Sequence, residues 1–189
     1  AIKLHGRLVI IKEISKKEKS KFLDVNHIQG NDKSEIYLGG FYKDQLVSVM
    51  TFVGKKSFNT KSKALKGSYE LSRFCVDNHY NIRGMASKLL TYFKNNFDYS
   101  QIITLCDLRW HDGNSYNAMV VKFAETTPPT YYYIVNNVRK HKWSYGKSSL
   151  KILLGSSFDI TKTEREMTLE LGYDRIWDCG KHKYILNKK

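Results

Sequence analysis

The sequence predicts a single α/β domain with a mixed, mostly antiparallel central sheet flanked by helices and a small basic appendage at its end. Strand-like runs and amphipathic segments alternate along residues 7–135, as in a chain that packs helices on a sheet. A length of 189 residues suits one such domain, and 41% hydrophobic and 13% aromatic residues are typical of a folded protein. Residues 1–135 are therefore predicted to form the core domain and residues 136–189 a basic, aromatic extension packed on it.

The first elements expected are a strand, a helix and a hairpin. The aliphatic run at residues 7–14 predicts the strand. Ser15 and Glu18 have the spacing of a capping box, which predicts that a helix starts there. Residues 35–41 and 45–53 are two β-rich runs separated by a three-residue turn, which predicts an antiparallel hairpin.

A loop, a strand and a second helix follow. Residues 54–67 are polar and basic without a clear period, which favours a loop, whereas residues 69–76 predict a strand. Helical spacing of apolar residues then predicts an amphipathic helix that buries Met85, Leu89, Leu90 and Phe93.

The remaining predicted elements become shorter. Residues 101–106 predict a buried strand that opens into the polar cluster 107–114, where a functional loop is expected. Residues 115–121 predict a short helix, residues 131–135 a β-rich run, and residues 161–171 another helix.

The charge of the chain favours a polyanionic partner. Thirty-two Lys and Arg against eighteen Asp and Glu give a net charge of +14 and a pI near 9.6, which points to DNA most strongly, or to RNA. The alternative is a charge that serves solubility. Two basic segments, residues 55–66 and 139–151, are expected to contact the nucleic acid. The candidate contacts in the second segment are Lys142, Trp143, Tyr145 and Lys147.

Cysteine and apolar content indicate the compartment. Cys75, Cys106 and Cys179 form no CxxC pair, which fits a reducing, cytoplasmic environment. The sequence shows no signal peptide and no apolar stretch long enough for a membrane span, so neither export nor membrane insertion is expected. His79 and His111 lack a zinc spacing, so no metal site is predicted. The oligomeric state stays open.

The densest cluster of ionisable groups begins at Asp107, directly after a predicted strand. A carboxylate there can act as a base or position an amine, and Arg109 and Trp110 beside it are candidate nucleic-acid contacts. The alternative is a salt bridge between Asp107 and Arg109. Arg73 lies inside an otherwise apolar strand and needs a partner such as Glu70, Asp107 or a ligand phosphate.

The predicted order of elements across residues 7–135 resembles the GNAT acyltransferase fold. Residues 76–86 (VDNHYNIRGMA) sharpen the resemblance, because in that family a strand leads into a glycine-rich loop and the next helix holds the pyrophosphate of coenzyme A on its backbone N–H groups. Asn81 stands where the family usually has Gln or Arg. The resemblance implies acetyl-CoA or a related thioester as cofactor, bound by Val76, Arg83, Gly84, Met85, Ala86 and Ser87.

The same resemblance suggests roles for other residues. Tyr116 would be the proton donor to a departing thiolate, although a core tyrosine is an equal alternative. His27 and Gln29 fall where GNAT proteins place the loop that covers the acceptor. His27 is then a base, a reader of a nucleobase edge or a metal ligand, or else simply a residue at the end of a helix.

Two bacteriophage families show further similarity. Residues 27–30, 70–74, 107–116 and 172–180 look like blocks of a phage domain associated with Hef-like homing endonucleases, but the chain has no recognisable nuclease motif. The core also resembles the phage Mom family, which modifies adenine in DNA to evade restriction. That resemblance makes site candidates of Arg73, Ser87, Asp107 and Tyr116, and it implies a phage-encoded protein in the cytoplasm of a bacterial host.

Three functions are therefore expected in descending order. The first is a Mom-like transferase that modifies nucleobases in DNA with an acyl-CoA or related donor and so protects DNA from restriction. The second is a non-catalytic DNA-binding module associated with a homing endonuclease. The third is an N-acetyltransferase that acts on protein or a small amine.

Overall fold

A computed structural model describes residues 1–54, 67–114, 116, 119 and 121–188, and these divide into two compact units. Unit 1 comprises Ala1–Cys106, His111–Glu125 and His182–Lys189, and unit 2 comprises Asp107–Trp110 and Thr126–Lys181. This division differs from the predicted boundary after residue 135, because the strand at residues 131–135 belongs to unit 2 and the end of the chain returns to unit 1. The basic loop at residues 55–66 and most of the helix expected at residues 115–121 lie outside the described residues.

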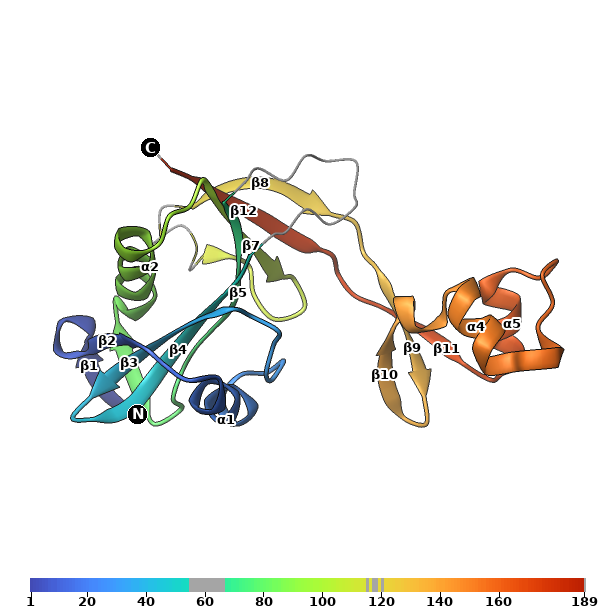
Figure 1. The fold of residues 1–189 in the computed structure, drawn as a ribbon, viewed down its shortest axis with the longest axis horizontal. Helices are drawn as coiled ribbons and strands as arrows, with labels where there is room; N and C mark the ends of the chain where they lie inside the picture. Colours follow the sequence, from blue (N-terminus) through green and yellow to red (C-terminus); the bar gives the residue numbers. More distant parts are fainter. Residues whose placement is uncertain (55–66, 115, 117–118, 120, 189) are drawn as a thin grey trace. The chain divides into compact units, whose positions relative to one another are not determined.

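Unit 1 is built around a seven-stranded sheet (Figure 1). Its elements are, in chain order, β1 (Ile2–His5), η1 (Gly6–Leu8), β2 (Ile10–Glu13), α1 (Lys16–Asn26), β3 (Ile36–Tyr42), β4 (Gln45–Gly54), β5 (Ser68–Val76), β6 (Tyr80–Arg83), α2 (Met85–Asn96), β7 (Gln101–Asp107), β8 (Lys122–Thr127) and β12 (Lys181–Asn187). The strand order is β2-β3-β4-β5-β7-β12-β8. Strands β2 to β5 pair antiparallel in succession, whereas β5 and β7 are parallel. This is the mixed, mostly antiparallel sheet that the sequence predicts.

The two long helices pack on different hydrophobic clusters. Leu89 and Phe93 of α2 are fully buried in the main core, where the ring of Phe93 stacks on Phe52 with centroids 3.8 Å apart. Phe22 and Leu23 of α1 form a smaller cluster with Val49. Both hydrogen bonds of the capping box between Ser15 and Glu18 are present at the start of α1, so this prediction is confirmed.

Unit 2 combines a three-stranded sheet with short helices. Its elements are β9 (Tyr131–Val135), β10 (Val138–His141), η2 (Lys142–Tyr145), α4 (Lys147–Leu154), η3 (Gly155–Ser157), α5 (Glu164–Glu170) and β11 (Asp174–Trp177). Strand β9 lies in the middle and pairs antiparallel with β10 and β11. Tyr133, Leu150 and Met167 are buried and mark the core of this unit.

Several elements were not expected from the sequence. β1 and β6 form a small parallel pair beside the main sheet, and β12 joins the main sheet between β7 and β8. The expectation of a basic extension is therefore wrong for the last strand, because non-local pairing recruits it into the core sheet. No helix among the described residues is both long and apolar enough to cross a membrane.

Candidate functional site

Two parallel strands of unit 1 separate in the middle of the sheet. β5 and β7 pair from Ser68 opposite Gln101 to Leu71 opposite Thr104, and among the described residues their register ends there. The following residues of β5 therefore present a backbone edge that β7 does not cover. An uncovered strand edge inside a sheet offers N–H and C=O groups to a ligand.

A β-bulge lies at the same point. β4 pairs with β5 through Phe52 opposite Leu71 and then Thr51 opposite Arg73, so Ser72 is the extra residue. A bulge of this kind changes the direction of the neighbouring side chains and often lies beside an active site. Leu71 and Phe74 consequently contact the main core, whereas Cys75 packs on the cluster beneath α1. Burial raises the pKa of the Cys75 thiol to about 12, which excludes it as a nucleophile at neutral pH.

The N-terminus of α2 borders a groove in unit 1. Its N-cap is Gly84, which has a φ of 79° and provides no side-chain cap, and a Cβ built there would meet nothing within 4 Å. The groove has a volume of about 500 Å³ and includes Phe74 and Val76 of β5 together with Gly84, Met85, Ala86 and Ser87. All the predicted cofactor-binding residues except Arg83 thus line this groove. Arg83 is exposed, pairs with His5 in the β1–β6 pair, and does not line this groove.

Tyr116 is linked to the point where the strands separate. Its hydroxyl is hydrogen-bonded with Thr104, and Thr104 in turn donates to the carbonyl of Leu71 at 3.2 Å. The ring stacks on Tyr184 with centroids 4.9 Å apart. Burial raises the pKa of Tyr116, so its hydroxyl keeps its proton at neutral pH. This geometry suits a proton donor, although the contacts also hold the residue as part of the core.

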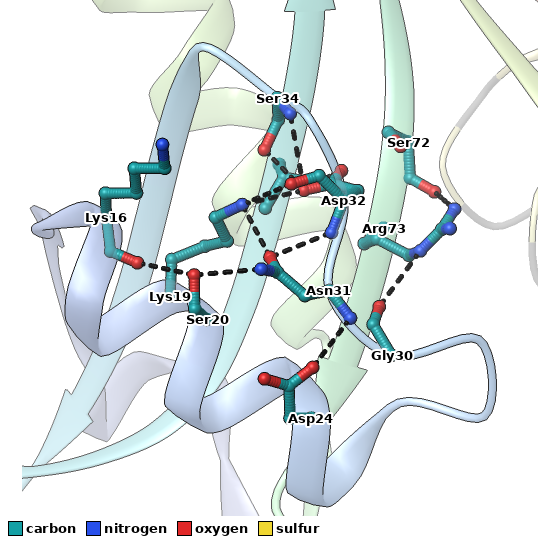
Figure 2. Close-up of polar contacts among 11 residues, drawn as sticks. Lys16, Lys19, Ser20, Asp24, Gly30, Asn31, Asp32, Ser34, Ser72 and Arg73 are labelled. Carbon is teal, nitrogen blue, oxygen red and sulfur yellow. Dashed lines mark hydrogen bonds and ion pairs between the residues drawn. The ribbon is translucent and has the colours of Figure 1, made fainter.

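A buried ion pair fixes the loop between α1 and β3 (Figure 2). Lys19 of α1 is fully buried, and its Nζ lies 2.7 Å from Asn31 Oδ1 and 3.1 Å from Asp32 Oδ1. Burial opposes the ionisation of Asp32, but donors on four side chains hold the pKa of that carboxyl at about 2; these are Ser34, Thr51, Ser72 and Lys19. No pattern in the sequence predicts this pair, because a lysine in a polar helix is normally exposed.

Arg73 of β5 and His27, the C-cap of α1, make hydrogen bonds with this loop. Arg73 donates through Nε to the carbonyl oxygen of Gly30 (3.3 Å) and through Nη1 to that of Ser72 (2.9 Å), and neither of these neutral acceptors neutralises its charge. Burial and the charge of Arg73 lower the pKa of His27 to about 4. Because His27 Nδ1 accepts the backbone N–H of Gln29 at 3.0 Å, the neutral ring carries its proton on Nε2. The neutral His27 ring is therefore a weak base that can donate a hydrogen bond through Nε2, and the contact of Gln29 with it is made by the Gln29 backbone N–H.

Asp107 forms a salt bridge with Arg109 in unit 2. Arg109 Nε lies 2.9 Å from Asp107 Oδ1, and the backbone N–H of Arg109 also donates to this oxygen. The hydrogen bonds from Arg109 lower the pKa of Asp107, so the carboxylate is a weak base at neutral pH. The geometry favours the salt bridge over a catalytic role for this residue.

The predicted nucleic-acid contacts in unit 2 differ in accessibility. Trp110 and Trp143 are 53% and 78% exposed. Tyr145, in contrast, is half-buried and makes T-shaped contacts with Tyr133 and Tyr173. Lys147 Nζ donates to the carbonyl of Ile160 inside the unit, whereas the Lys142 ammonium lies 5.8 Å from the centre of the Trp143 ring.

Solved structures share this fold. An acetyltransferase from Bacillus subtilis, solved with CoA, superposes with a TM-score of 0.53 at 10% identity over 96% of this chain and 99% of its own. A putative GNAT-family acetyltransferase from Desulfovibrio desulfuricans gives 0.53 at 8% identity over 95% and 98%. The ribosomal-protein-S18-alanine N-acetyltransferase from Escherichia coli gives 0.52 at 9% identity over 95% and 93%. The fold is therefore that of the GNAT acetyltransferases.

Comparisons of sequence identify no relative of this chain. No family model matches the chain, and no curated protein matches it.

Proposed function

We propose that this chain is an N-acyltransferase that takes its acyl group from a CoA thioester and transfers it to an amine of a nucleobase in DNA. The observation that carries the first part is the separation of β5 and β7 after Leu71 and Thr104, beside the groove at the N-terminus of α2. The nature of the acceptor rests on the net charge of +14 and on the resemblance of Arg73, Ser87 and Tyr116 to site residues of the phage Mom family.

The chemistry of the groove suits the coenzyme. Without a side-chain cap, the first N–H groups of α2 and the positive end of its dipole favour an anion such as a diphosphate. At Gly84 the absence of a Cβ allows such a group to approach the backbone. The bound thioester would supply an acyl carbon open to attack by an amine.

The side chains at the separated strands would assist the transfer. The uncovered edge of β5 after Leu71 offers backbone N–H groups where negative charge develops on an acyl oxygen. Tyr116 holds a proton at neutral pH and would donate it to the leaving sulfur, and the proton that the amine loses on acylation would return to the tyrosinate. On the acceptor side, the charge of Arg73 and the Nε2–H of His27 would orient a phosphate or a base edge.

A second acceptor class has one observation in its favour. The neighbour from Escherichia coli is by name an N-acetyltransferase of the alanine of a ribosomal protein, and it covers 95% of this chain. A protein amine is therefore the alternative acceptor. A binding module without coenzyme affinity is the further alternative that the substitution at Asn81 suggests.

Ser87→Asp tests the coenzyme site directly. An aspartate in the first turn of a helix stabilises the helix, yet its charge would repel a diphosphate at the same N-terminus. A repulsion of about 2 kcal/mol at this range weakens binding by a factor of about thirty. Calorimetry with acetyl-CoA should show this loss of affinity for Ser87→Asp. The control is Ser87→Asn, because asparagine has the shape of aspartate without its charge, and this variant should bind acetyl-CoA like the parent. Failure of the parent to bind acetyl-CoA would refute the proposed function.

The acceptor is tested separately. DNA from cells that express the protein should contain an acylated nucleoside by mass spectrometry, and cells that express Tyr116→Phe should contain much less. If the purified protein binds acetyl-CoA but modifies only peptide amines, the nucleobase is the wrong acceptor and the protein amine is correct.

A further inference from the structure

All three tryptophans of the chain lie exposed in unit 2. Trp110, Trp143 and Trp177 are 53%, 78% and 58% exposed. Large rings normally contribute to a core, and clustered exposed rings indicate an interaction surface. Unit 2 has a core of its own around Tyr133, so these rings are not needed to fill it.

Three rings form a continuous series at one end of the small sheet. Tyr132 of β9 lies opposite His141 of β10, and the two rings meet edge to face with centroids 5.2 Å apart. His141 then stacks on Trp143 with an angle of 11° between the rings and 6.3 Å between centroids. We call Tyr132, His141 and Trp143 the aromatic platform.

Cations surround this platform. The Arg139 guanidinium lies 3.6 Å above the centre of the Tyr132 ring, and Arg109 lies 6.0 Å from the same ring and 5.8 Å from that of Trp110. Lys142 lies near Trp143. Residues 139–151 contain five Lys and Arg and no Asp or Glu, whereas Arg109, outside this segment, is paired with Asp107.

We propose that the aromatic platform binds single-stranded nucleic acid. Flat, exposed rings such as that of Trp143 stack on unpaired bases, and the flanking cations of Arg139 and Lys142 pair with the phosphates between them. In a duplex the base faces are covered by their neighbours and cannot reach the rings. The surface therefore selects the unpaired form, which is also the form in which an enzyme reaches a base amine. This inference rests on the proposed nucleobase acceptor and adds that the nucleic acid binds as a single strand.

The test uses the full protein without coenzyme. An oligothymidylate of about 12 nucleotides spans a typical site, and a hairpin duplex of equal charge is the comparison. Quenching of tryptophan fluorescence reports unit 2 directly, because it holds every tryptophan. We expect the single strand to bind at least tenfold more tightly than the duplex and to quench this fluorescence.

Matched variants separate stacking from charge. Trp143→Ala should weaken binding about tenfold and leave its salt dependence unchanged, because no charge is lost. Ile152→Ala removes a side chain that is 86% exposed elsewhere in unit 2 and should have no effect. Trp143→Phe should restore most of the affinity, which excludes a folding defect. Equal binding of the duplex, or unchanged binding by Trp143→Ala, would overturn the inference.

The outcome is independent of the coenzyme experiment. Binding of acetyl-CoA without binding of the single strand would refute only the aromatic platform. Binding of the strand without acetyl-CoA would refute only the transferase.

Discussion

Removal of the Lys19 ammonium should destabilise unit 1 by about 3 kcal/mol. Lys19 is fully buried, and the Asp32 side chain that it pairs with is 5% exposed. Breaking a buried pair by removing one partner costs about 3 to 5 kcal/mol, because the other charge is left without compensation. The hydroxyl donors of Ser34, Thr51 and Ser72 remain in Lys19→Met, so the lower end of this range applies.

The assay must report on unit 1 alone. Tryptophan fluorescence would follow unit 2, and a chain of two units need not unfold in one step. Hydrogen exchange of the β4 and β5 amides at neutral pH measures the opening free energy of the sheet beside the ion pair. Lys17→Met changes an exposed lysine of the same helix and should alter this free energy by less than about 0.5 kcal/mol.

A double variant sharpens the result. Asp32→Asn in the Lys19→Met background removes the orphaned charge, so it should add little further loss, and the two sites should couple by at least about 1 kcal/mol. If the β4 and β5 amides of Lys19→Met exchange as slowly as those of Lys17→Met, the Lys19–Asp32 pair does not stabilise unit 1, and the prediction is refuted.

Two further predictions concern the side chains of the candidate site. His27 has a pKa lowered to about 4 from its usual 6.5, so between these values the unfolded chain binds more protons and stability falls as the pH is lowered. Because solvent screens this half-buried ring, the free energy of unfolding should fall by about 1 to 2 kcal/mol between the two pKa values. His27→Gln should remove that part of the pH dependence in denaturation curves at pH 4 to 6.5. An unchanged dependence of the unfolding free energy on pH in this variant would contradict the prediction. Tyr116→Phe should lower the rate constant of transfer about a hundredfold with an unchanged Kd for acetyl-CoA by calorimetry, whereas a purely structural tyrosine would affect both or neither.

Local patterns in the sequence predicted the elements of unit 1 that depend on neighbouring residues. The capping box of Ser15 and Glu18, the β3–β4 hairpin and the apolar face of α2 were all anticipated. Each depends on hydrogen bonds or side-chain spacing within a few residues, or on a tight turn. The groove at Gly84 was anticipated for the same reason, because a glycine at the start of a helix is visible in the sequence.

The tertiary structure decided what long-range pairing controls. β12 enters the sheet beside β7, with Gln101 donating to Asn187 across 86 residues, and no local signal marks that partnership. Tyr145 looked available for stacking, but its ring is packed within unit 2 by residues distant in sequence.

The sequence by itself determined the α/β class, the GNAT-like order of elements and the residues around Gly84, since periodicity, capping and glycine content are local properties. Only the tertiary structure decided that Lys19 is buried against Asp32, that Asp107 is paired with Arg109, and that Tyr116 lies where β5 and β7 separate. The Lys19–Asp32 pair and the position of Tyr116 depend on which groups distant in sequence share a buried site, whereas the Asp107–Arg109 pair depends on the conformation of the chain at the end of β7. Burial and hydrogen bonds then keep Asp32 and Asp107 ionised and Tyr116 protonated at neutral pH.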